Sequence, residues 1–205
     1  SRTGEDLFRF THVMQLLVAH ERYWRPLQAF RHRMAHVNAF STDFQVPTAT
    51  AGFLVDSDSV HHRRRDWEEP SHVSLAVETP ENLEVLSEVK GLDEEISSIE
   101  MARRLDALGW VKVFCDVRQH LPTVSLPFSG NSGDEDTEQE ESSEFTSRDL
   151  KAKYASWSSK KWHAPLGHTV LVANSKNEAY EKLNSAGKPY MDQLARDLIK
   201  LINDA

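Results

Sequence analysis

Two residues, Asp43 and His168, have the chemical types and the sequence surroundings that acid–base chemistry needs. Asp43 closely follows a short apolar segment, and His168 precedes the run TVLV. A carboxylate that holds an imidazole in a fixed orientation makes that imidazole a general base. Each residue also has an ordinary interpretation, since an Asp at a strand end often forms a turn and a lone histidine often bonds to backbone. Asp56 and Asp58 are alternative acids, and His163 is an alternative base.

The segments around these residues predict alternating helices and strands. Apolar residues at helical spacing predict a helix over residues 11–30, and the apolar run 34–40 predicts a buried strand. Residues 97–108 form a second helix candidate that Gly109 ends. The stretch WVKVFCDV, residues 110–117, alternates as a strand does. A closing helix is predicted from the apolar positions Met191, Leu194, Ala195, Leu198, Ile199 and Ile202, with Pro189 near its first turn.

Other stretches are predicted to be irregular. Asp43 ends the first strand, and Pro47 prevents an immediate return to regular structure. Residues 57–80, which include HHRRRDWEEP, are polar and predict a solvent-exposed loop. Residues 129–147 hold a dense acidic run and almost no apolar side chains, so we expect a disordered insertion there. His168 is expected in a loop after the last strand.

The resulting order is a helix, a strand followed by an Asp, a long excursion, a helix, a strand, a His-bearing loop and a closing helix. This is the order of the C-terminal half of an α/β-hydrolase, in which the triad acid follows one late strand and the histidine follows the last. We therefore expect an α/β fold with a mostly parallel sheet and flanking helices. Residues 1–205 would form the C-terminal portion of one such domain, interrupted by the acidic insertion.

Four separated sequence blocks resemble the eukaryotic serine esterases, a lipase-like branch of the α/β-hydrolases. The first is the TG..L opening, the second F..R..YAN....D..VP..TA, the third L..L.WV.V, and the fourth a histidine segment that ends in NSAG. The matching residues are Thr3, Gly4, Leu7 and Phe8; Phe30, Arg33, Asn38, Asp43, Val46, Pro47, Thr50 and Ala51; Leu105, Leu108, Trp110, Val111 and Val113; and His168 with residues 184–187. The resemblance covers the chain except for about 55–95 and the insertion, and it implies Asp43 as triad acid and His168 as triad base.

The chain also departs from the pattern of this family. His36 and Val37 stand where the family has Tyr-Ala, and Thr169 replaces the asparagine that usually follows the histidine. The G-x-S-x-G turn that would carry the nucleophilic serine is absent, because PFSGNSG leads into the predicted insertion. The resemblance thus implies a hydrolase of carboxylic esters, lipid esters included, to which this chain gives the acid and the base. The nucleophile, the oxyanion hole and the early strands would lie upstream of Ser1, in the other half of the same domain.

Composition limits the partners and the location that we expect. The 205 residues carry a net charge of −8, which argues against nucleic acid as the main partner. With Cys115 as the single cysteine there is no disulfide framework, which suits the cytoplasm. The apolar runs are too short to span a bilayer, and the chain starts at Ser1 without a leader, as part of a longer protein would. Peripheral contact with membranes is a further expectation. Arg63, Arg64 and Arg65 are most simply part of a solvated loop, and contact with acidic headgroups is the weaker alternative.

The sequence also offers a metal site, an acyl pocket and a non-catalytic role as interpretations. The pairs His61 with His62 and His163 with His168 invite a metal site, but no thiolate or carboxylate set completes either, so no metal and no cofactor is expected. Trp157 and Trp162 could line an acyl pocket, although such residues are more often core. The alternative to an esterase is a non-catalytic scaffold or binding protein that keeps the hydrolase framework and uses residues 134–141 as an interaction segment.

Overall fold

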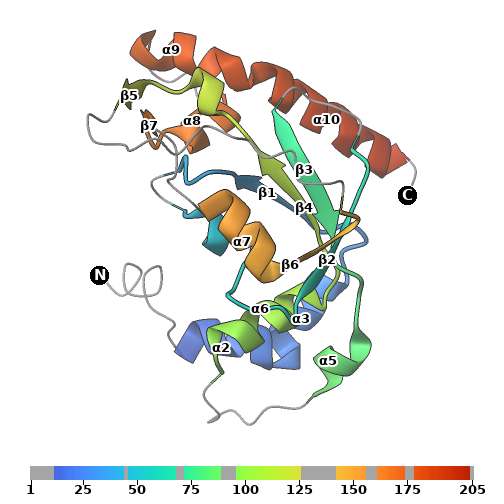
Figure 1. Cartoon of the computed structure of the whole chain (residues 1–205). Helices are drawn as coiled ribbons and strands as arrows, with labels where there is room; N and C mark the ends of the chain where they lie inside the picture. The colour runs from blue at the N-terminus through green and yellow to red at the C-terminus, as the bar shows by residue number, and fades with distance from the viewer. Residues whose placement is uncertain are drawn as a thin grey trace.

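The computed structural model describes residues 12–43, 46–67, 72–88, 96–125, 142–155, 161–173 and 178–203. Helices and strands alternate along this part of the chain (Figure 1). The helices are α2 (His12–Ala19), α3 (Glu21–Gln28), α4 (Thr48–Ala51), α5 (Leu83–Ser87), α6 (Ser98–Asp106), α7 (Ser147–Ala155), α8 (Gly167–Leu171), α9 (Glu178–Asn184) and α10 (Lys188–Asn203), with 3-10 turns η1 (Arg118–His120) and η2 (Ser185–Gly187). The strands are β1 (Met34–Asn38), β2 (His61–Arg64), β3 (Val73–Glu78), β4 (Val111–Cys115), β5 (Thr123–Ser125), β6 (Glu144–Thr146) and β7 (Lys161–His163).

A five-stranded mixed sheet, in the order β1-β4-β3-β2-β6, forms the centre of the fold. Strands β1 and β4 are parallel, with Asn38 opposite Cys115 at their carboxyl ends. The pairs β4/β3, β3/β2 and β2/β6 are antiparallel, so the sheet is mixed rather than mostly parallel as expected. The reason is that residues 57–80 contribute β2 and β3, and β3 runs antiparallel to both of its neighbours, β4 and β2. Strands β5 and β7 form a separate two-stranded sheet.

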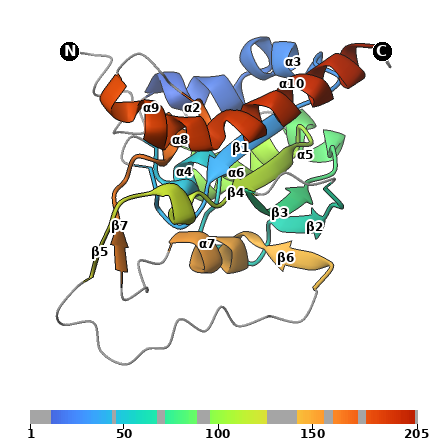
Figure 2. The ribbon, with the colours of Figure 1, turned by 90° about the horizontal axis from the view of Figure 1, so that it is seen from above.

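Helices cover both faces of the sheet, as Figures 1 and 2 show for α7 and α10. Val37 and Phe114 lie on one face and pack with Leu150 and Tyr154 of α7. The opposite face carries the alternate positions of β4, which pack against α8 and α10; this cluster contains Val113, Cys115, Val117, Leu121, Val170, Leu171 and Tyr190. The alternation predicted for WVKVFCDV is therefore confirmed, because neighbouring positions of β4 enter different cores.

Several other predicted elements agree with the structure. Helix α6 begins after Ser97, whose hydroxyl accepts a hydrogen bond from the Glu100 amide, and Gly109 follows it with a φ of 77°. That left-handed conformation favours glycine. Helix α10 begins at Lys188 with Pro189 in its first turn, as predicted.

Four expectations about local structure were wrong. Residues 11–30 form two helices instead of one, because extended backbone at His20 ends α2 and caps α3 through a bond from the Arg22 amide to Nδ1 of His20. Pro47 does not delay regular structure; it is the N-cap residue of α4. His168 lies in the first turn of α8 rather than in a loop.

The fourth correction concerns residues 57–80, which were expected to be an exposed loop. Strand β2 lies within HHRRRDWEEP and buries His62, with 1% of the residue exposed, between exposed neighbours. Strand β3 follows and pairs with both β2 and β4. Because the one buried side chain of β2 is an imidazole, the strand shows no alternation of apolar and polar residues. The polar sequence therefore did not indicate a strand.

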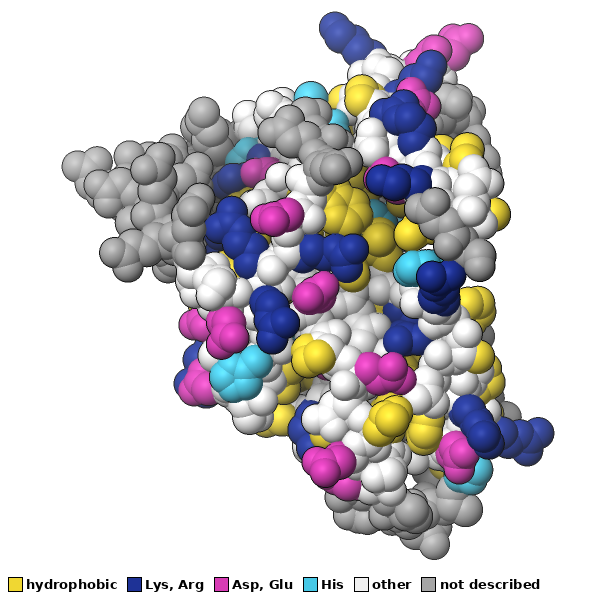
Figure 3. Space-filling view, turned by 90° about the vertical axis from the view of Figure 1, so that its right-hand side faces the viewer, with side chains coloured by type: hydrophobic (Ala, Val, Ile, Leu, Met, Phe, Trp, Pro, Cys, Tyr) yellow, Lys and Arg dark blue, Asp and Glu magenta, His cyan; other side chains and the backbone are white. Residues whose placement is uncertain are grey.

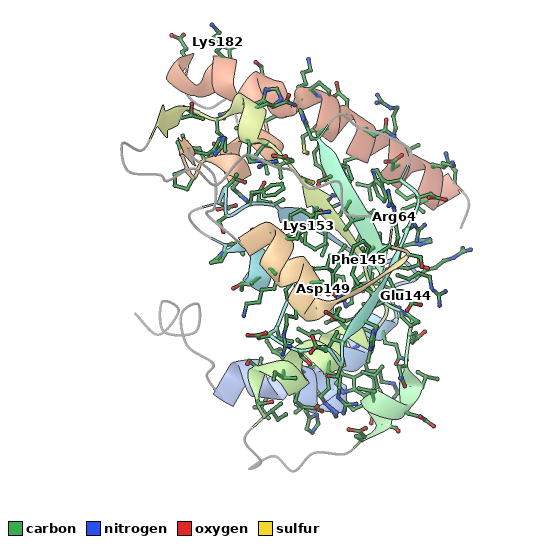
Figure 4. All side chains as sticks on the ribbon, viewed as in Figure 1. Arg64, Glu144, Phe145, Asp149, Lys153 and Lys182 are labelled. Carbon is green, nitrogen blue, oxygen red and sulfur yellow. The ribbon has the colours of Figure 1, made fainter. Side chains whose placement is uncertain are left out.

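The predicted disordered insertion at residues 129–147 is corrected at its carboxyl end. Strand β6 pairs with β2, and Figure 4 shows Glu144 and Phe145 beside Arg64. The next helix begins with a reciprocal cap: Asp149 accepts from the amide and hydroxyl of Thr146, at 2.9 and 2.7 Å, and its own amide donates to that hydroxyl. Residues 129–141 lie outside the described residues.

Candidate active site

The carboxyl end of β1 leads into a tight turn that carries Asp43. Phe40 and Ser41 both adopt left-handed backbone, with φ of 57° and 53°. Such conformations are unfavourable for residues with a Cβ, so the surrounding structure must hold them in place. The Thr48 hydroxyl does this by accepting from the Ser41 amide at 3.1 Å and donating to the Asn38 carbonyl at 2.7 Å. The turn is therefore pinned to the strand that precedes it.

The carboxylate of Asp43 is buried and is oriented by hydrogen-bond donors. Its side chain is 5% exposed. The side-chain amide of Asn38 donates to Oδ2 at 2.9 Å, and the Val46 amide donates to Oδ1 at 3.3 Å. A buried carboxylate needs such donors, because it loses the hydrogen bonds of water. Both oxygens of Asp43 are consequently fixed in direction.

Helix α8 brings His168 to this carboxylate. Asp43 and Leu166 form an antiparallel bridge, and the Gly167 amide donates to the Thr42 carbonyl at 2.7 Å. Nδ1 of His168 then lies 3.6 Å from Oδ2 of Asp43. This distance is within ion-pair range and is longer than a hydrogen bond. The His168 side chain remains 54% exposed, so another molecule can reach the imidazole.

Two glycines permit the close approach of these segments. A Cβ at Gly167 would lie 2.7 Å from the Thr42 carbonyl oxygen and 2.8 Å from the Thr42 hydroxyl. A Cβ at Gly187 would lie 1.6 Å from the Val170 carbonyl oxygen. A larger residue at position 167 would separate α8 from the Asp43 turn, and one at position 187 would separate η2 from α8. Glycine is therefore required at both contacts on grounds of space.

The alternative acids are not at this site. Asp56 and Asp58 are exposed and pair with Arg148, at 2.7 and 2.6 Å. His163 lies in β7 and is paired in register with Thr123 of β5. The structure thus brings together the first-choice acid and base, His168 with Asp43, and places the reserve acids elsewhere.

Residues of two further expectations are only partly described. Trp157 lies outside the described residues, as does the PFSGNSG stretch, and the side chain of Trp162 is not described. Within the described part of the chain, no group of three or more His, Cys, Asp or Glu could hold a metal ion. None of the described helices is long and apolar enough to cross a membrane.

A second polar cluster, which the sequence did not reveal, is buried beneath the sheet. Nζ of Lys112 lies 2.6 Å from Oδ1 of Asp106 and 2.9 Å from Nε2 of His62, and the Lys112 and His62 side chains are fully buried. Burial lowers the pKa of Lys112 and lowers that of His62 to about 3, and it raises the pKa of Asp106 to about 6. The imidazole therefore stays neutral and accepts from the ammonium group. The only sequence signal was a lysine within an otherwise apolar strand.

The surface seen in Figure 3 carries Lys and Arg side chains interspersed with Asp and Glu. Comparison of the chain with protein-family models, with curated proteins and with solved structures finds no match. Function is therefore inferred from the geometry of the site and from the sequence resemblance.

Proposed function

We propose that this chain provides the acid, Asp43, and the base, His168, of a serine esterase or lipase site. The observation that carries the proposal is the meeting of the two side chains at the carboxyl ends of β1 and β4. Asp43 follows β1, and His168 comes later in the chain, in α8 after β7; the acid therefore precedes the base, as in an α/β-hydrolase. The four sequence blocks that resemble the eukaryotic serine esterases support the same assignment. The proposed substrates are carboxylic esters, lipid esters included.

In this proposal His168 takes the proton of a serine hydroxyl and later returns it to the leaving alcohol. Asp43 accepts the hydrogen bond from Nδ1, which leaves Nε2 unprotonated and free to act as the base. The buried carboxylate also stabilises the imidazolium that forms, because its charge lies close to the ring and is poorly screened. The exposure of His168 leaves room for the serine and the substrate.

The nucleophile must come from outside these residues, because the sequence has no G-x-S-x-G turn. Strand β1 is an outer strand of the sheet, and no strand of the described residues pairs with its second edge. We propose that strands from the upstream half of the same hydrolase domain pair there and carry the serine. An unpaired edge strand is otherwise an aggregation hazard. A cytoplasmic location with peripheral membrane contact is part of this proposal and rests on composition alone.

An activity test needs the chain in the polypeptide or complex that holds the serine. We expect hydrolysis of p-nitrophenyl acyl esters, and labelling of the serine by an alkyl fluorophosphonate. Asp43→Asn should lower turnover by about four orders of magnitude, the effect of the same change in the Ser-His-Asp template. His168→Ala should abolish labelling.

Asp56→Asn is the matched control, since it removes an exposed carboxylate that pairs with Arg148 and should keep full activity. Full turnover in the Asp43→Asn variant would contradict the proposal. Retained ester hydrolysis in both Asp43 and His168 variants would point to chemistry elsewhere. An absence of any hydrolysis or labelling in wild type would favour the scaffold alternative.

A further inference from the structure

Asn38 occupies a special position relative to the candidate acid. It is the last residue of β1 and is 7% exposed. Its Nδ2 lies 2.9 Å from Oδ2 of Asp43. A carboxylate can only accept hydrogen bonds, so the NH₂ group and not the amide oxygen must face it. The orientation of the Asn38 side chain is thereby set by chemistry.

The atom that Asn38 holds is the one that faces the base. Oδ2 of Asp43 is 2.9 Å from Nδ2 of Asn38 and 3.6 Å from Nδ1 of His168. The other oxygen, Oδ1, accepts from the Val46 amide. The Asn38 amide therefore donates to the carboxylate oxygen that lies nearer the base, and its loss removes a restraint on rotation of the carboxylate about the bond to Cβ.

Asn38 itself is anchored more firmly than a surface asparagine. Its backbone pairs with Cys115 of β4, and its carbonyl accepts from the Thr48 hydroxyl at 2.7 Å. Its Oδ1 is buried without a hydrogen-bond partner among the described atoms, and lies 3.2 Å from the position of a Cβ at Gly167. A buried amide with an unpaired oxygen is unfavourable for stability alone. A role for the NH₂ group of Asn38, which donates to Asp43, accounts for an asparagine at this position.

We propose that Asn38 is a positioning residue that aims the Asp43 carboxylate at Nδ1 of His168. The inference rests on the proposed function, in which Asp43 and His168 act as a pair. It adds a residue that touches neither the nucleophile nor the substrate. Asn38 acts on the base only through Asp43, by restricting the rotation of one carboxylate.

The experiment compares two variants of nearly the same size, Asn38→Leu and Asn38→Asp. Leu removes the donor together with the unpaired oxygen, so the fold should persist. Asp keeps the shape but places an acceptor against the Asp43 carboxylate, which repels it. If Asn38 only filled space, both variants would behave as wild type. If it positions Asp43, both should release the carboxylate.

The first readout is the tautomer of His168, from long-range ¹⁵N–¹H spectra of the full chain at a pH where the ring is neutral. His168→Gln assigns the signals, and Asp43→Asn defines the spectrum of a lost pair. Wild type should show the proton on Nδ1, and both Asn38 variants should move toward the Asp43→Asn spectrum. In the serine-containing protein their turnover should fall about 100-fold with KM unchanged, the effect of a slight misplacement of a reacting group.

The two possible failures give different results. A wild-type tautomer in both Asn38 variants, with Asp43→Asn shifted, would overturn the positioning role and leave the proposed function standing. A wild-type tautomer in Asp43→Asn would show that no pair exists, which would overturn both. Thermal melts of each variant confirm that the spectra come from folded protein.

Discussion

Replacement of Gly167 by alanine is the most direct structural test of how α8 meets the Asp43 turn. The new Cβ would lie 2.7 Å from the Thr42 carbonyl oxygen, 2.8 Å from the Thr42 hydroxyl and 3.2 Å from Oδ1 of Asn38. The carbonyl belongs to the backbone and cannot rotate away as a side chain can. It also accepts the Gly167 amide at 2.7 Å, so relief of the clash requires that this hydrogen bond lengthen.

The expected cost of Gly167→Ala follows from these contacts. Overpacking of a well-packed site costs about 1 to 3 kcal/mol. Loss of one internal hydrogen bond costs about 0.5 to 1.5 kcal/mol. A destabilisation of about 2 to 4 kcal/mol is therefore expected, which for a chain of this size lowers Tm by roughly 4 to 16 °C. His168 should also move away from Asp43, because the bridge at Leu166 lies directly before the altered residue.

Urea unfolding and a thermal melt measure the stability, and the ¹⁵N spectrum of His168 reports the pair. Gly52→Ala is the matched control, since its nearest contacts are 3.2 Å to the flexible Leu54 side chain and 3.3 Å to the Thr48 carbonyl oxygen. Its φ of −92° suits alanine, so its stability should stay within about 1 kcal/mol of wild type. A Gly167→Ala variant that matches wild type in both stability and tautomer would refute the close approach of α8.

Three further predictions concern buried groups. Lys112→Met leaves Asp106 buried without its partner and should destabilise the fold by about 3 to 5 kcal/mol, and adding Asp106→Leu should recover most of this in urea titrations. The pKa of His62 is lowered to about 3, so as pH falls this histidine is protonated in the unfolded chain before it is protonated in the folded chain. Its contribution to stability should therefore be lost as pH falls from about 6.5 toward 3. Asp106, whose pKa is raised to about 6, has the opposite effect on stability as pH falls. The pH dependence of the free energy of unfolding of His62→Gln must therefore be subtracted from that of wild type to isolate the effect of His62. A slope that is unchanged in His62→Gln would contradict the assignment. Burial raises the pKa of the Cys115 thiol to about 12, and Ellman's reagent should react with it only when the chain opens, at a rate that rises with urea rather than at once on mixing.

Elements with strong local patterns could be predicted from the sequence. Strand β4 alternates between two cores, α6 has a serine cap and a terminal glycine, and α10 repeats apolar residues at helical spacing. Each of these signals lies within the element itself. Strands β2 and β6 lack such a signal, because β2 is held by pairing with distant segments and by the burial of His62 against Lys112. The four polar residues of β2 contain no signal that indicates Lys112, which lies fifty positions after His62, as a partner.

The candidate site was only partly predictable for the same reason. Asp43 and His168 were selected from the order of the sequence blocks, and the structure places them together. The two contacts that hold the site, from Asn38 to the carboxylate and from Gly167 to Thr42, could not be derived from the sequence. An asparagine at a strand end and a glycine before a histidine are common. Their importance depends on how closely α8 approaches β1, which is a property of the folded chain.

Two His–Asp pairs among the described residues lie at nearly equal distances, and their comparison shows what distinguishes a candidate site from a structural contact. His168 lies 3.6 Å from Asp43, and His62 lies 3.7 Å from Asp106. The His62 side chain is fully buried and meets an ammonium group, so neither a serine nor a substrate can reach it. The His168 side chain is 54% exposed beside an acid that is 5% exposed. Distance alone would rank the two pairs as equals, whereas an accessible base held by a buried, oriented acid is what proton transfer to another molecule requires.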